Sequence, residues 1–338
     1  MTPVRSTPSG VSLTRALAFA AGLLCASLTA QAQAPAAPAA YPNKPIRLVV
    51  NFPPGGAADT IARAVAAPLQ DALGQSVVVE NRAGSGGNLG GDLVAKSAPD
   101  GYTLLMSSGG MVSVNPFIYP KMPFDPAKDL TPVAAAARVL VFLVTKPALP
   151  VDNGKAFVAY LKANPGKLTY GSPGNGSSPH LAGEMFKSQA GVFAVHVPYR
   201  GAAPALQDLL AGQIDYTFDP GIGIPHVRAG KLKLLAVGSP KRSPLFPDVP
   251  TVEEAMGLKG FDADSVFGFY APAGTPADIV NRLNREINRT LALPAVRERI
   301  LALGGEPAPM TPAQFHAKAE EDAKRFGAII RERKIVAD

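Results

Sequence analysis

The sequence has little cysteine: its 338 residues contain only Cys25. That cysteine lies in an apolar stretch, residues 16–28, which follows two arginines and precedes the small-residue run Ala30-Gln31-Ala32. The stretch is short for a bilayer span, so we interpret residues 1–32 as a cleaved secretory signal rather than a retained anchor helix. We therefore expect a mature chain without disulfides or thiolate metal sites, held together by its core.

Motifs for several kinds of chemistry are also absent. The histidines show no metal-binding spacing, and Ser178 lacks the second glycine of a Gly-x-Ser-x-Gly elbow because His180 stands there. The run GSGGNLGGD (84–92) has Leu89 where a dinucleotide loop needs glycine and Asp92 where a P-loop needs lysine. The sequence thus predicts no metal, no cofactor and no enzyme, with a periplasmic hydrolase as the remaining alternative.

Charge and hydropathy bear on whether the protein binds nucleic acid and whether it spans a membrane. The net charge is +7, and removal of the two arginines of the signal would leave +5. Lysines and arginines are scattered, and no zinc-finger or RNP1-like sequence occurs, so we expect no nucleic-acid partner. Residues 33–40 are rich in Ala and Pro and are predicted to be a disordered tail. No later run of eighteen apolar residues exists, so the mature protein should be soluble.

The rest of the chain alternates between strand and helix patterns, which predicts an α/β fold with helix-covered parallel sheets. A first series is expected as strand 46–50, helix 59–73, strand 77–80, helix 89–96 and strand 102–106. After a Pro-rich connection (115–132), a second series is expected as strand 139–145, helix 155–163, strand 168–170, helix 180–189, strand 195–199, helix 204–210, strand 214–218 and strand 232–237. Two sheets are implied.

Proline and threonine mark features of individual helices. Pro68 should kink its helix or shift one of its boundaries. Thr275 and Thr311 are each followed by proline, and each pattern predicts a capping threonine with proline at the first helical position.

Two loops could carry binding chemistry. FPPGGAADT (52–60) and YGSPGNGSSPHL (170–181) each connect an apolar strand to a helix, and each is rich in glycine. Helix N-termini favour anions, and the two loops could face each other across a cleft. Neither contains Lys or Arg, so the donors would be backbone amides and Ser or Asn side chains, which suit a carboxylate. The alternative is that both are tight turns that need glycine only for backbone reasons.

Ordered motifs along the chain resemble one known family. They are YPNKPIRLVV, FPPGGAADTIAR, LGQSVVVENRAGSGGNLG, PDGYTLLM, YGSPGNGSSPHLAGEMF, HVPYRG, FPDVPT and APAGTP. This set is similar to the Bug family of periplasmic solute-binding proteins, the substrate-binding components of tripartite tricarboxylate transporters. The resemblance covers residues 41–330.

The resemblance implies a periplasmic-binding-protein-like Venus flytrap of two α/β domains with a cleft and two hinge crossovers. Domain 1 would combine residues 41–138 with 239–338, and domain 2 would be 139–238. It implies a monomer in the periplasm that captures a small carboxylate for inner-membrane permease subunits; a sensor for a signalling partner is the alternative. The implied ligand-binding residues are Phe52, Gly55, Gly56, Ala57, Ser107, Ser172, Gly176, Ser177, Ser178, Tyr199 and Asp219.

Three residues depart from the family pattern. Asn51 replaces a usual proline, Arg200 a common lysine, and Val266 a usual tryptophan. Asn51 adjoins the first loop, so the ligand itself stays open among dicarboxylates, amino acids and aromatic acids. Asp219 has two interpretations: with Pro220 behind it, it could cap a helix, or it could accept a hydrogen bond from the far end of the ligand.

Overall fold

The computed structural model describes residues 1–3 and 41–337. Residues from Pro42 onward form one compact unit. The predicted signal and tail lie outside the described residues, apart from the first three positions. Within the described part, no helix is both long and apolar enough to cross a membrane.

A mixed six-stranded sheet forms one half of the unit. Its order is β11-β4-β10-β3-β1-β2. Strand β1 pairs in parallel with β2 and β3, whereas β10 runs antiparallel to β3 and β4, and β11 antiparallel to β4. The bounds are β1 (Ile46–Val50), β2 (Val77–Asn81), β3 (Thr103–Ser107), β4 (Leu130–Val139), β10 (Ser265–Pro272) and β11 (Gly305–Pro307).

A five-stranded sheet, also mixed, forms the other half. Its order is β7-β6-β8-β5-β9, with β6 parallel to β7 and β8, and β5 antiparallel to β8 and β9. The bounds are β5 (Phe142–Thr145), β6 (Thr169–Ser172), β7 (Val195–Pro198), β8 (Tyr216–Asp219) and β9 (Lys233–Val237). We call the two sheets with their helices the six-stranded half and the five-stranded half. The predicted domain division at 138/139 and 238/239 stays a prediction.

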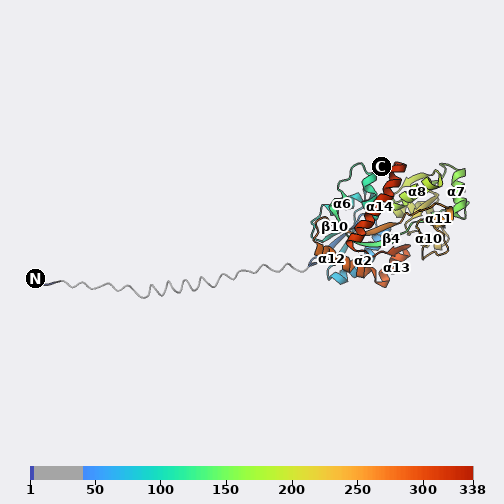
Figure 1. Ribbon diagram of the computed structural model, residues 1–338. Helices are drawn as coiled ribbons and strands as arrows, with labels where there is room; N and C mark the ends of the chain where they lie inside the picture. The colour runs from blue at the N-terminus through green and yellow to red at the C-terminus, as the bar shows by residue number, and fades with distance from the viewer. Residues whose placement is uncertain (4–40, 338) are drawn as a thin grey trace. The chain divides into compact units, whose positions relative to one another are not determined.

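Helices pack on both sheets (Figure 1). Those of the six-stranded half are α2 (Ala57–Leu73), α3 (Asn88–Ala95), α4 (Gly109–Ser113), α5 (Asn115–Ile118), α6 (Pro126–Asp129), α12 (Ala277–Leu291) and α13 (Pro294–Ala302), with a 3₁₀ turn at Ser85–Gly87. Those of the five-stranded half are α7 (Gly154–Ala163), α8 (Ser178–Ala190), α9 (Ala202–Leu210), α10 (Ile224–Arg228) and α11 (Val252–Met256).

The C-terminal helix α14 (Pro312–Arg333) contacts both halves. It packs on α4 and β4 of the six-stranded half and on α8 of the five-stranded half. Its buried Phe326 and Ile330 join an apolar core that includes Tyr170 and Phe186. Beyond the helix, the backbone N–H of Ala337 donates to the carbonyl of Ile118 at 2.9 Å. One helix thus ties the two sheets together.

Several expected elements differ from the observed ones. The run 139–145 is not one strand: β4 ends at Val139 and β5 begins at Phe142, while the fully buried Leu140 and Val141 pass between the sheets. The sequence of this run predicts one strand because six of its seven residues are apolar. The connection expected at 115–132 contains α5, α6 and the start of β4. Helix α2 continues through Pro68 without a break in its assignment.

The two predicted threonine caps have different outcomes. Thr311 caps α14 as predicted: its hydroxyl accepts from the Gln314 N–H at 3.2 Å, and the Gln314 side chain accepts from the Thr311 N–H. The cap at Thr275 is wrong. Helix α12 begins at Ala277, and the Thr275 hydroxyl donates instead to the carbonyl of Pro272 at 2.7 Å.

Candidate functional site

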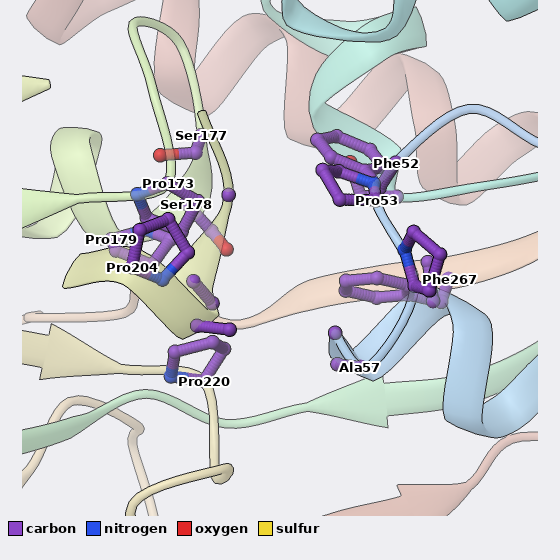
Figure 2. Close-up of a pocket in the computed structure, with 17 residues that line it drawn as sticks. Phe52, Pro53, Ala57, Pro173, Ser177, Ser178, Pro179, Pro204, Pro220 and Phe267 are labelled. Carbon is purple, nitrogen blue, oxygen red and sulfur yellow. The ribbon is translucent and has the colours of Figure 1, made fainter. Parts of the chain in front are cut away.

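A cavity of about 120 Å³ lies where the two halves meet. Figure 2 shows residues of the two halves facing each other across it. The six-stranded half contributes Phe52, Pro53, Pro54, Gly56, Ala57, Ala58, Ser108 and Phe267. The five-stranded half contributes Pro173, Ser177, Ser178, Pro179, Gly201, Ala202, Ala203, Pro204 and Pro220. None of these described residues carries a charged side chain, so the wall is apolar apart from hydroxyls and backbone.

The first loop of the site leads from β1 into α2. Gly55 has a φ of 81°, which glycine adopts without strain. Its N–H donates to Asp59 Oδ2 at 3.0 Å. Burial raises the pKa of Asp59, but hydrogen bonds from Arg63, Gly55 and Asn81 outweigh it and hold the pKa below its ordinary value. The backbone N–H of Ala57, in the first turn of α2, has no acceptor within the helix and remains available to an anion.

The second loop leads from β6 into α8. Ser177 caps α8: its hydroxyl accepts from the His180 N–H at 3.4 Å and donates to the Gly174 carbonyl at 2.7 Å. Pro179 has no N–H to offer. The Ser178 N–H lies in the first helical turn without an acceptor in the helix, and its hydroxyl lines the cavity. Ser178 therefore presents two donors at the same place.

Two stacked imidazoles support the second loop from behind. His180 Nδ1 accepts from the Gly176 N–H at 3.0 Å, so the neutral ring carries its proton on Nε2. The rings of His180 and His196 stack at 4.1 Å between centroids. Burial, and then His196, lower the pKa of His180 to about 3. His180 is therefore a neutral acceptor that positions the loop, a role that its sequence position did not indicate.

The two halves touch around the cavity, and glycines make this approach possible. A Cβ on Gly176 would lie 2.3 Å from Ile118 Cδ1, one on Gly201 3.1 Å from Pro53 Cγ, and one on Gly221 1.6 Å from the Leu303 carbonyl oxygen. In each pair the glycine belongs to the five-stranded half and its neighbour to the six-stranded half. The molecule is thus in a closed arrangement around the cavity.

The structure distributes the eleven predicted ligand-binding residues between the cavity wall and its surroundings. Five of them line the cavity: Phe52, Gly56, Ala57, Ser177 and Ser178. Gly176 lines a smaller adjoining space of about 20 Å³, and Tyr199 lines a neighbouring cavity. The remaining four, which line none of these three cavities, are Gly55, Ser107, Ser172 and Asp219. Ligand contact by each of the eleven stays a prediction.

Three of the residues away from the cavity wall have identified partners. The buried Ser107 hydroxyl accepts from Asn51 Nδ2 at 2.9 Å and donates to the Ser108 carbonyl. Ser172 Oγ lies 2.7 Å from His196 Nε2. Tyr199 donates its hydroxyl to Asp208 at 2.6 Å; burial and this bond raise its pKa to about 12. These side chains are engaged within the protein.

Asp219 ends β8 beside the cavity residue Pro220. Its Oδ1 accepts from the N–H groups of Gly221 at 2.7 Å and Gly223 at 2.8 Å. Burial raises the pKa of Asp219 to about 6 despite these bonds. Helix α10 begins only at Ile224, so Pro220 is not a first helical position. The carboxylate closes the turn before α10, which favours the structural interpretation over ligand selection.

Several lining residues were not expected from the sequence. Phe267 comes from β10 and Ser108 from the cap of α4, and neither residue was among the predicted ligand-binding residues. Pro204 lies in α9 and Pro220 follows the end of β8. The signal that could have found them is chain order in an α/β sheet, because loops at strand ends gather at one edge. Among the described residues, no group of three or more His, Cys, Asp or Glu side chains is placed to hold a metal ion.

Comparisons with known proteins agree with this geometry. The model of the tripartite tricarboxylate transporter family receptor matches residues 61–335. BugT of Bordetella pertussis is 41% identical over 325 residues, which cover 95% of this chain and 98% of BugT.

Solved structures with the same fold include two that bear on the site. The periplasmic binding protein BugD has a TM-score of 0.82 and 34% identity, covering 88% of this chain and 100% of BugD. An R. palustris protein with adipate has a TM-score of 0.85 and 36% identity, again over 88% of this chain and 100% of that one. The expected fold class, a two-sheet α/β periplasmic-binding-protein fold, is confirmed, and the chain belongs to the tripartite tricarboxylate transporter receptor family.

Proposed function

We propose that this receptor captures a small carboxylate between its two halves and delivers it to permease subunits of a tripartite transporter. The observation that supports this proposal most directly is the cavity at which the two loop-to-helix junctions meet. Helix α2 and helix α8 both begin at its wall, and their first-turn amides lack acceptors within the helices. Two helix N-termini directed at one small space form a site for an anion.

The absence of lysine and arginine from the described cavity wall favours a carboxylate that is held by neutral hydrogen-bond donors rather than by a cation. Ser178 and Ser108 line the cavity, and their hydroxyls make no hydrogen bond to another described side chain or backbone group. A charge-assisted bond to a carboxylate contributes about 1.5 to 3 kcal/mol, so a few such donors suffice for tight binding. The adipate bound to the R. palustris neighbour is a ligand of this class.

Location and partners belong to the same proposal. The N-terminal pattern of a cleaved signal and membership in a family of transporter receptors support a location in the periplasm, where we propose that the receptor acts as a monomer. The described cavity wall offers no paired acid and base, and the half-buried Ser172–His196 pair does not line it, which supports binding without turnover. Ligand recovered chemically unchanged after incubation would agree with a receptor, and any conversion would indicate an enzyme.

Isothermal titration calorimetry tests the proposal directly. Purified protein should bind one or more members of a dicarboxylate series that includes adipate, and at least tenfold more weakly their uncharged diamides, because only the anion gains from the helix N-termini. The diamide is the matched control because it keeps length and shape. Equal binding of acid and amide would contradict the function.

A further inference from the structure

A second cavity adjoins the first, and the proposed function assigns no part of the ligand to it. Its volume is about 530 Å³. It shares Phe52, Pro53, Pro173 and Gly201 with the first cavity, and Figure 2 shows Phe52 and Pro53 on the side of the first cavity opposite Pro173. The shared residues come from both halves, so the two spaces lie on either side of one partition. A ligand that extends past this partition would enter the second cavity.

The second cavity differs from the first in charge. Arg200 lines it, is exposed, and makes no ion pair or hydrogen bond with another described residue. No acidic side chain is among its described lining residues. The neighbouring Tyr199 hydroxyl is already engaged with Asp208 at 2.6 Å and does not occupy the guanidinium. An unpaired arginine offers a planar fork of donors that matches a carboxylate.

The opposite wall is a glycine loop, residues 83–87, that is fixed in place. Four successive residues have positive φ: 140° at Gly84, 49° at Ser85, 62° at Gly86 and 93° at Gly87. Glycine adopts positive φ values without strain, which explains the three glycines of this run. The loop leaves no large side chain between the backbone and the cavity.

Two asparagines from the six-stranded half hold that loop. Asn51 Nδ2 donates to the Gly87 carbonyl at 3.1 Å, and Asn115 Nδ2 donates to the Gly86 carbonyl at 3.0 Å. A Cβ on Gly87 would lie 2.4 Å from Asn51 Nδ2, so only glycine allows this contact. Asn51, which is fully buried, therefore acts as a positioning residue for the wall opposite Arg200.

We propose that the second cavity is the second compartment of the ligand site, and that the guanidinium of Arg200 binds a second anionic group of the ligand there. This inference rests on the proposed function, because it assumes a carboxylate in the first cavity. The expected ligand has one carboxylate at the two helix N-termini and its second anionic group beyond the Phe52–Pro173 partition, at Arg200. Arg200 lines the second cavity and no described lysine or arginine lines the first, so the two ends of the ligand bind in different environments.

The experiment compares ligands of equal length with one or two carboxylates. Adipate and hexanoate form such a pair, and further dicarboxylates with their matching monocarboxylates extend the series. Calorimetry should show that Arg200→Gln binds the tightest dicarboxylate with three- to tenfold lower affinity than the wild type, as expected for loss of a partly exposed ion pair. The affinity for the matching monocarboxylate should not change. Arg297→Gln, which removes an exposed arginine on α13 away from both cavities, is the control and should change neither.

Salt provides a second readout. Raising ionic strength from about 20 mM to about 200 mM should weaken dicarboxylate binding in the wild type and not in Arg200→Gln, because an exposed pair is screened. Equal effects of the substitution on both ligands, or no effect on either, would overturn the inference and leave carboxylate capture intact. If no carboxylate binds the wild type, the proposed function fails, and this inference fails with it.

Discussion

Ser177 and Ser178 are neighbours in sequence with different roles in the structure. Ser177 uses its hydroxyl within the protein, as an acceptor for the His180 N–H and a donor to Gly174. Ser178 has its hydroxyl at the cavity and its N–H in the first turn of α8. Both residues were predicted to bind the ligand, but the structure gives the free donor only to Ser178.

Substitution of each serine alone separates these roles. Ser178→Ala should weaken carboxylate binding by about 1.5 to 3 kcal/mol, the value of one hydrogen bond to a charged acceptor, and should leave stability unchanged. Ser177→Ala should lower the free energy of unfolding by about 1 kcal/mol through loss of a helix cap. Calorimetry and chemical denaturation measure the two effects. Unaltered affinity in Ser178→Ala would remove this hydroxyl from the site.

The sequence could predict the two loops of the site but not every side chain in its wall. Glycine, serine and proline between a strand and a helix have a local physical meaning, so Gly56 and Ser178 were identifiable. Ser107 and Ser172 also lie at strand ends, yet each is buried and bonded to Asn51 or His196. Which face of a strand end meets the cavity depends on how the two halves pack, and one sequence does not contain that information.

At the scale of elements, local rules worked where the chain is locally amphipathic and failed where it is buried on all sides. The cap at Thr311, with proline at the first helical position of α14, was predicted correctly. Strand β10 was missed although all eight of its residues are buried. It contains Gly268 between Phe267 and Phe269, where the Phe315 ring packs against the glycine, and an all-buried strand shows no alternation.

The turn between β8 and α10 carries a buried titratable group. Because the folded-state pKa of Asp219, about 6, is above its unfolded value near 4, its stabilising contribution is complete below pH 4 and is lost as the pH rises through 6. From pH 5 to pH 8 this loss should amount to about 1 to 2 kcal/mol. Asp219→Asn keeps an acceptor without the charge. Denaturation curves should therefore show that the free energy of unfolding of the variant rises relative to the wild type by that amount between pH 5 and pH 8.

The exposed Asp248 supplies the control for this prediction. Asp248→Asn makes the same substitution at an exposed position outside this turn. A constant difference between Asp219→Asn and the wild type from pH 5 to pH 8 would show that Asp219 is charged in both states. Unchanged ligand affinity in Asp219→Asn would agree with its role in the turn rather than in ligand selection.

At the scale of the whole molecule, the two chain crossovers near 138/139 and 238/239 are expected to act as hinges. The halves touch around the cavity, so ligand should stabilise the closed arrangement, and small-angle scattering should give a smaller radius of gyration with ligand than without it. Gly110 lies in α4, and a Cβ there would be 3.1 Å from the Gly176 carbonyl oxygen across the interface. Gly110→Leu should therefore hold the halves apart, weaken binding and abolish the contraction.

Gly212 is a suitable comparison for that variant, because it lies in a surface turn with no atom within 4 Å of an added Cβ. Its φ of 75° makes Gly212→Ala mildly strained without involving the interface, so the contraction should persist. Scattering curves that are identical with and without saturating ligand in the wild type would mean a rigid site.

The strand order of the six-stranded sheet also sets the order in which the chain can fold. Strand β10, residues 265–272, lies between β3 and β4, which precede it by more than a hundred positions. A growing chain therefore keeps the edges of β3 and β4 unpaired until most of its length has been made, whereas the strands of the other sheet all lie within residues 142–237 and can pair earlier. Any product that stops before β10 also lacks β11, so β3 has one open edge and β4 has two, and chaperones and proteases can recognise such edges.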